Sequence, residues 1–147
     1  MQTDLIAILQ NLPSNALIPL FVMKIEPSSN PDCTWEGYLP SDNCNFLKEA
    51  VGAIHNIGQL PVVFSTARIW QKLFGSSCDT FASDTSTYLV YANYESNGHV
   101  NSTQTFDDFV SFGGWSIDSG FVVAKQVFGN TTVPLLCGSI AWHAYVD

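Results

Sequence analysis

The sequence predicts an α/β fold with mostly parallel strands, and three stretches of the chain support this prediction. Residues 16–27 begin with an unbroken apolar run before Lys24, which is typical of a strand buried on both faces. A continuous apolar stripe at helical spacing predicts a long helix that ends at Gly58, and a β-branched run over residues 60–65 predicts a second buried strand. Strands that alternate with helices favour a parallel sheet, because parallel neighbours need a long crossover connection.

Local signals predict the remaining elements. Apolar residues at helical spacing predict a short helix over residues 3–12, which ends before Pro13. Ser41 or Asp42 can cap the long helix. The later elements are predicted as a helix over residues 66–74, a loop over 75–86, a strand over 88–94, a polar loop over 95–105, one helical turn over 106–112, a strand over 120–128, and an ending strand or irregular segment over 135–145.

Composition and charge limit the possible functions. The 147 residues suffice for one domain at most, and 46% of them are hydrophobic, which provides an ample core. Thirteen acidic residues against five basic ones give a net charge of −8, and the basic residues are scattered along the chain. This balance excludes a nucleic-acid partner, because no basic cluster is available to displace phosphate counterions. No cofactor is predicted.

The chain carries features of a secreted glycoprotein. Its four cysteines suit an oxidising compartment, and glycosylation sequons begin at Asn101 and Asn130. No apolar run reaches the roughly 18 residues that span a bilayer, and the first residues lack the basic region of a secretory signal. We therefore expect a secreted or lysosomal-vacuolar protein whose natural amino terminus lies upstream of Met1.

The positions of the cysteines suggest how they pair, although four cysteines allow three connectivities. Cys33 and Cys44 lie on either side of one loop, so a local bridge between them is the first expectation. Cys78 would then pair with Cys137 and link a middle loop to the last segment. No metal site is predicted, because the cysteines lack the Cys-x-x-Cys or Cys-His spacing of metal ligands.

Glu26 is the first candidate for a functional residue. It follows the predicted strand directly, and functional groups of parallel sheets gather where the strands end at their carboxyl side. Lys24 lies two positions earlier and should project from the same face of the strand. A simple ion pair between these two side chains is the structural alternative to catalysis.

Several separated segments, found in the expected order, carry a family resemblance. The segments VMKIEPSSNPDCTW, YLVYANYE, FGGW and AKQVFG resemble glycoside hydrolase family 25 lysozymes over residues 21–145. The resemblance implies a TIM-like (β/α) barrel, here its carboxyl-terminal portion, so that residues 1–147 form a single lysozyme-like domain that is incomplete at the amino end. A complete small α/β domain is the alternative.

The same resemblance implies a degenerate catalytic site. Glu26 matches the general acid/base of the family, but Lys24 occupies the place of an aspartate and favours the ionised glutamate. Asn93 and Glu95 replace a histidine and an aspartate, and Trp142 stands where another site aspartate is expected. Glycoside hydrolysis usually requires two carboxyl groups across the scissile bond, so these replacements argue against activity.

Three functions remain open at this point. The first is an inactive lysozyme-like protein that serves as a structural or self-assembling module, with a homo-oligomer, a filament or a missing amino-terminal half as partner. The second is an active muramidase that cuts peptidoglycan with Glu26 as acid. The third is a glycan-binding module, for which aromatic side chains could stack on sugar rings or instead form core. The candidate substrate-binding residues are Tyr91, Tyr94, Glu95, Trp115 and Trp142.

Overall fold

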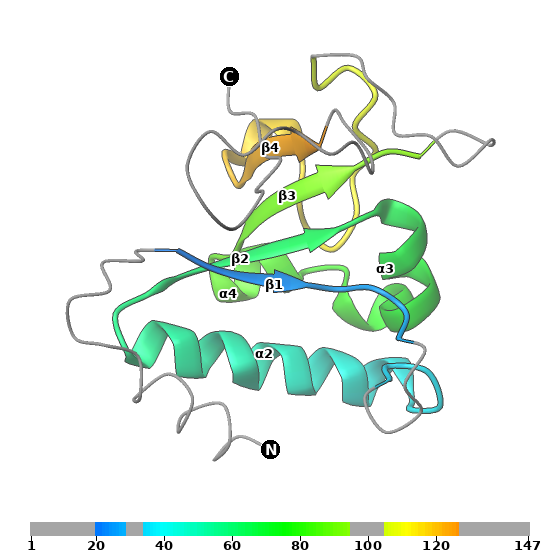
Figure 1. Ribbon diagram of the computed structural model, residues 1–147, viewed down its shortest axis with the longest axis vertical. Coiled ribbons are helices and arrows are strands. Elements are labelled where there is room, and N and C mark those ends of the chain that lie inside the picture. The colour runs from blue at the N-terminus through cyan, green and yellow to red at the C-terminus, as the bar shows by residue number, and fades with distance from the viewer. Residues whose placement is uncertain (1–19, 29–33, 95–104, 127–147) are drawn as a thin grey trace, which may run out of the picture.

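The computed structural model describes residues 20–28, 34–94 and 105–126, and a four-stranded parallel sheet lies at its centre (Figure 1). The strands pair in the order in which they occur along the chain. They are β1 (Leu20–Lys24), β2 (Leu60–Ser65), β3 (Tyr88–Ala92) and β4 (Val122–Gln126). This arrangement confirms the predicted α/β class with parallel strands, whereas the barrel stays a prediction.

Helices form the connections between the strands. Helix α2 (Pro40–Asn56) joins β1 to β2, while α3 (Ala67–Phe74), the 3₁₀ helix η2 (Gly75–Cys78) and α4 (Phe81–Thr85) join β2 to β3. A second 3₁₀ helix, η3 (Ile117–Ser119), precedes β4. Helix α2 packs against α3, η2 and α4, so the crossovers gather on one side of the sheet (Figure 1). Right-handed connections between consecutive strands produce this one-sided arrangement.

Helix α2 begins differently from the sequence prediction. Leu39 is its N-cap residue and makes no side-chain capping bond, so Ser41 and Asp42 lie inside the helix. Pro40 explains the shift, because proline at the first helical position has the right φ angle and no N–H to satisfy. The predicted end is confirmed: Gly58 has a φ of +75° and donates its N–H to the carbonyl of His55.

The segment between β2 and β3 is more helical than predicted. Helix α3 begins as expected, because the hydroxyl of Thr66 accepts a hydrogen bond from the backbone N–H of Ile69 at 3.1 Å. The predicted loop over residues 75–86 instead contains η2 and α4. Phe81 and Ala82 of α4 are completely buried, so tertiary packing stabilises a helix that its small and polar neighbours do not favour.

Strand β1 corrects another expectation. The predicted strand over residues 16–27 is described from Leu20 onward. It lies at one edge of the sheet as far as the chain is described, and its residues are exposed or partly exposed instead of being buried on both faces. Both ends of β1 are exposed, with Leu20 46% accessible. The predictions that lie outside the described residues are the helix over 3–12, most of the polar loop over 95–105 and the segment over 135–145.

Two tryptophans organise the core. Trp70 packs its ring against Phe74, Phe81 and Trp115, and Trp115 donates its indole N–H to the carbonyl of Thr87 at 2.8 Å. Gly113 lies against both rings and has no room for a side chain. A Cβ at this position would lie 2.7 Å from the Trp115 ring and 2.8 Å from the Trp70 ring. The two-glycine segment before Trp115 is therefore required by packing.

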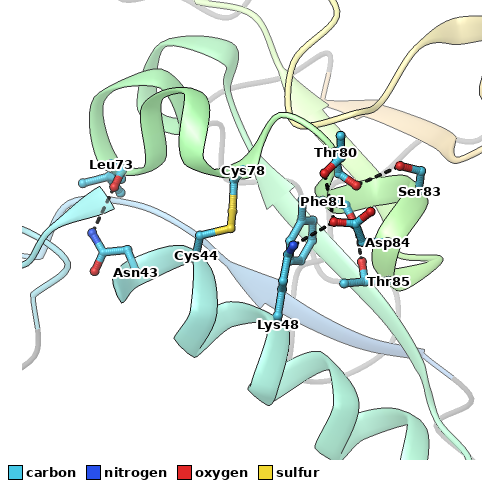
Figure 2. Close-up of a disulfide and its surroundings, with 10 residues drawn as sticks. All are labelled: Asn43, Cys44, Lys48, Leu73, Cys78, Thr80, Phe81, Ser83, Asp84 and Thr85. Atoms are coloured by element: carbon cyan, nitrogen blue, oxygen red, sulfur yellow. Dashed lines mark hydrogen bonds and ion pairs between the residues drawn. A yellow bond between two sulfur atoms is a disulfide. The ribbon is translucent and has the colours of Figure 1, made fainter. Parts of the chain in front are cut away.

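A disulfide ties α2 to η2 and corrects the predicted pairing. Cys44 and Cys78 are bonded, with their Cα atoms 5.6 Å apart (Figure 2). The pairs Cys33–Cys44 and Cys78–Cys137 are therefore wrong, and Cys33 and Cys137 lie outside the described residues. The prediction considered loop closure alone, whereas the packing of α2 against η2 brings Cys44 and Cys78 together in the core cluster.

Asn43 reinforces the same junction. Its side-chain amide donates to the carbonyl of Leu73 at the end of α3 and to the carbonyl of Trp35 before α2, both at 3.0 Å. Figure 2 shows the bond to Leu73 beside the disulfide. A buried amide that satisfies two carbonyl groups fixes the relative positions of these segments.

We expect that a Cys44→Ala/Cys78→Ala variant loses about 3 to 4 kcal/mol in the free energy of unfolding, because the bridge joins residues separated by 34 positions and constrains the unfolded chain. Urea denaturation followed by circular dichroism measures this loss. Peptide mapping of the unreduced wild-type protein is the control. A peptide that contains Cys44 bonded to Cys33 would contradict the assignment.

Candidate functional site

A pocket of about 580 Å³ opens at the carboxyl ends of β2 and β3. Its lining comes from four segments: Pro27 after β1, the first residues of α3, the end of β3 with the residues after it, and a segment over residues 108–112. This is the edge of the sheet at which parallel-sheet proteins bind ligands, because the connecting loops converge there.

Asp108 is the central polar group of the pocket wall. Its carboxylate accepts hydrogen bonds from the Tyr91 hydroxyl at 2.8 Å and from the Asn93 amide at 3.0 Å. The ammonium of Lys125 lies 2.9 Å from the same carboxylate, and the exposed fractions of the two side chains are only 4% for Lys125 and 15% for Asp108. Residues 107 and 108 were predicted to form a solvated helix start; Asp107 is exposed, but Asp108 is largely buried.

The surroundings of Asp108 determine its protonation state. Burial acts to raise the pKa of this carboxyl group, but the hydrogen bonds from Lys125, Asn93 and Tyr91 together lower the pKa below its ordinary value. Burial, with the hydrogen bond to Asp108, raises the pKa of Tyr91 far above its ordinary value. At neutral pH the pocket wall therefore contains a carboxylate that is held in its ionised form and a neutral phenol, and neither group is suited to donate a proton.

Aromatic packing holds the segment that carries Asp108. The rings of Phe106 and Phe109 contact the Tyr91 ring, with centroids 6.0 and 4.9 Å away. Within the helical turn predicted over residues 106–112, the structure has a hydrogen-bonded turn but no helix, and the bond from the Phe109 N–H to the Phe106 carbonyl closes this turn. Packing against β3, and not helix propensity, thus shapes this wall.

Glu26 lies beside the pocket. Its carboxylate is 2.9 Å from the ammonium of Lys24, and the two side chains are 51% and 60% exposed. The expected ion pair is present, but it is exposed and not partly buried, because β1 is an edge strand. Such an exposed pair contributes about 0 to 1 kcal/mol to stability. Pro27, and not Glu26, is the residue of this segment that lines the pocket.

The structure separates the predicted aromatic ligand-binding residues. Tyr94 lines the pocket and is 47% exposed, whereas Tyr91 lines it with its hydroxyl already bonded to Asp108. Trp115 is completely buried in the core, which corrects its predicted role as a sugar-stacking residue. Glu95 and Trp142 lie outside the described residues, as do the sequon residues Asn101 and Asn130.

The sequence prediction missed the importance of Lys125. This lysine is 4% exposed near the carboxyl end of β4 and shares the face of the sheet with its neighbour Tyr91. A cation inside an apolar strand is a usable signal, because a buried charge requires a partner of opposite sign. The charge of Lys125 therefore points to an acidic partner near the strands that precede or follow β4 in the sequence.

The described part of the chain has neither a metal-binding cluster nor a membrane-spanning helix. No group of three histidine, cysteine, aspartate or glutamate side chains there is placed to hold a metal ion. Among the helices that the structure describes, none has the length and apolar character needed to cross a membrane.

The fold and the pocket define the class of protein: an α/β protein with a parallel sheet and a ligand-sized pocket at the carboxyl ends of its strands. The family model described as lysozyme-like protein 1 matches residues 23–126. The chain therefore belongs to the lysozyme-like protein 1 family.

The chain is also similar to a curated protein, Counting factor 50 of Dictyostelium discoideum. The two sequences are 34% identical over 92 residues, which cover 62% of this chain and 26% of the relative. The chain thus spans about a quarter of that protein's length. No solved structure matches the chain significantly.

We expect Asp108→Asn to lower the free energy of unfolding by about 3 to 5 kcal/mol, because it leaves the buried ammonium of Lys125 without its carboxylate. Asp107→Asn is the matched control, since Asp107 is the exposed neighbour whose carboxylate accepts a hydrogen bond from Thr105. That change should stay within about 0.5 kcal/mol. Equal losses in the two variants, measured by urea denaturation, would contradict the role of Asp108.

The lowered pKa of Asp108 predicts a specific pH dependence. A carboxyl group whose pKa is lower in the folded state contributes stability above its unfolded pKa, and this contribution is lost as the pH falls through the folded pKa. The stability difference between wild type and Asp108→Asn should therefore be constant near neutral pH and shrink below the ordinary pKa of 3.8. Urea denaturation over a series of pH values tests this expectation, and a difference that does not change with pH would disprove it.

Proposed function

We propose that this member of the lysozyme-like protein 1 family does not hydrolyse glycans and serves as a structural or binding module. One observation carries the proposal: Asp108, the carboxylate that lines the described pocket, is held in its ionised form by three donors. A glycoside hydrolase needs, besides an ionised carboxylate, a carboxyl group that stays protonated to assist the leaving oxygen, and the contacts of Asp108 exclude it from that acid role.

The contacts of Glu26 support the same proposal. The glycoside hydrolase family 25 resemblance assigns the general acid to Glu26, whose carboxylate forms an exposed ion pair with Lys24. An active muramidase would need a second group to do the work of the replaced aspartate, either the acetamido oxygen of the substrate or Glu95. The ion pair therefore favours an inactive site over a muramidase.

We also propose that the four strands belong to a TIM-like barrel of the family 25 type. The sequential parallel order and the one-sided helices both fit such a barrel. Val62 and Phe64 of β2 lie on the face of the sheet opposite to the core residue Val63. At the amino ends of β1 and β2, Leu20 and Leu60 lie on this same face and are 46% and 45% exposed. Further strands from an amino-terminal half, or copies of the chain in a homo-oligomer or filament, would cover this face and the open edges.

The proposed location is extracellular or lysosomal-vacuolar. A buried disulfide between Cys44 and Cys78 supports an oxidising compartment, because intracellular proteins rarely keep such a bond. Glycans on Asn101 and Asn130 would be compatible with that location.

We expect the purified protein to leave suspensions of bacterial cell walls turbid, and Glu26→Gln to change nothing. An active lysozyme on the same walls is the positive control. Clearing of the suspension by the wild type, together with its loss in Glu26→Gln, would show instead that the chain is a muramidase.

A glycan-binding role is the second candidate, and the exposed ring of Tyr94 in the pocket favours it. If sugars stack on this ring, Tyr94→Ala should weaken the binding of soluble chitin or peptidoglycan fragments about threefold to tenfold. Tyr38→Ala is the matched control, because Tyr38 is 65% exposed and does not line the pocket. Titration calorimetry measures both variants, and equal affinities would exclude Tyr94 as a binding surface.

A further inference from the structure

We propose that the pocket binds a saccharide that carries a carboxylate, and that Arg68 holds this carboxylate. The inference rests on the glycan-binding role proposed above and adds the charge of the ligand to it. The described charged residues that line the pocket are more often positive than negative, whereas the whole chain has a net charge of −8.

Three charged residues line the pocket: Arg68, Lys72 and Asp108. Asp108 is compensated by the buried ammonium of Lys125, and the ammonium of Lys72 pairs with the carboxylate of Glu36. Arg68 is exposed, and it has no acidic partner among the residues that the structure describes. Among the described residues, the pocket therefore presents one positive charge without an acidic partner, which favours an anionic ligand.

The position of Arg68 suits a carboxylate. The planar guanidinium offers paired N–H groups that match the two oxygens of a carboxylate, so it can bind the group in a bidentate way. Arg68 is also the second residue of α3, and the first helical bond runs from the Trp70 N–H to the Thr66 carbonyl. The backbone N–H groups of Ala67 and Arg68 precede that bond and have no partner within the helix, and both residues line the pocket.

The rest of the pocket suits a sugar ring better than a small inorganic anion. Tyr94 is 47% exposed and Val110 is 67% exposed, and Phe109 and Phe112 are partly buried beside them. These apolar surfaces would face the carbon-bound hydrogens of a ring, while Arg68 takes its carboxylate. The volume of about 580 Å³ falls within the range of roughly 300 to 1,000 Å³ found for small-molecule sites.

Titration calorimetry on the full chain at low salt tests the proposal with two ligands: the trimer of galacturonic acid and its methyl ester, which keeps the rings but removes the charges. We expect the acid to bind more tightly than the ester. Arg68→Gln should weaken binding of the acid about tenfold, which corresponds to the loss of a charge-assisted pair of hydrogen bonds, and Arg68→Lys should have an intermediate effect.

Lys48→Gln is the matched control. It removes a cation that pairs with Asp84 (Figure 2), and neither of these two residues lines the pocket. Equal losses in Lys48→Gln and Arg68→Gln would overturn the proposal, since both would then reflect net charge alone. Equal affinities for the acid and the ester would overturn it too. Displacement of the trimer by hexaglutamate with equal affinity would overturn the choice of a saccharide.

The failure of this inference can be distinguished from the failure of the glycan-binding role. Binding of neutral chitin fragments without preference for the acid would contradict the role of Arg68 and leave the sugar-binding pocket in place. Absence of binding to the trimer, the ester and the chitin fragments would contradict both. Circular dichroism of each variant checks the fold, which the exposed position of Arg68 should preserve.

Discussion

The carboxylate of Asp108 joins three parts of the chain that are distant in sequence. Tyr91 and Asn93 reach it from the end of β3, Lys125 reaches it from β4, and Asp108 itself belongs to the segment that connects these two strands. Burying a carboxylate is costly, and the three donors compensate for this cost only while all these segments keep their places. The interactions of the Asp108 carboxylate therefore hold the wall of the pocket in place, and the aromatic contacts around Tyr91 add to them.

The same arrangement limits the chemistry of the pocket. A carboxylate that is needed to neutralise a buried lysine cannot also change its protonation state during a reaction. The chain thus combines a pocket at the ligand-binding edge of a parallel sheet with a wall carboxylate that is held in its ionised form. Membership in a lysozyme-like family and an inactive site are compatible, because the scaffold and the catalytic residues can be lost or retained independently.

The sequence predicted the regular elements well where local signals agree with packing. The limits of β2 and the extent of α3, predicted over residues 66–74, follow from local patterns, and both match the structure to within one residue. The prediction failed where distant residues decide: α4 forms because Phe81 fits the core, and Cys44 pairs with Cys78 because both are buried between α2 and η2. The pocket edge was predictable from the parallel sheet, and the cation of Lys125 within an apolar strand indicated an acidic partner, but the identity of that partner as Asp108 depends on how a long connection folds back.

The covalent and hydrogen-bonded junction between α2 and the end of α3 has a further consequence. Cys44, Cys78 and Asn43, which form this junction, are all absent from the pocket lining. The residues that hold the helices together are thus distinct from those that would touch a ligand. Substitutions in the pocket rim at exposed positions such as Arg68 or Val110 carry little risk for folding. A scaffold of this kind allows relatives to change what they bind during evolution while they keep the same helices and strands.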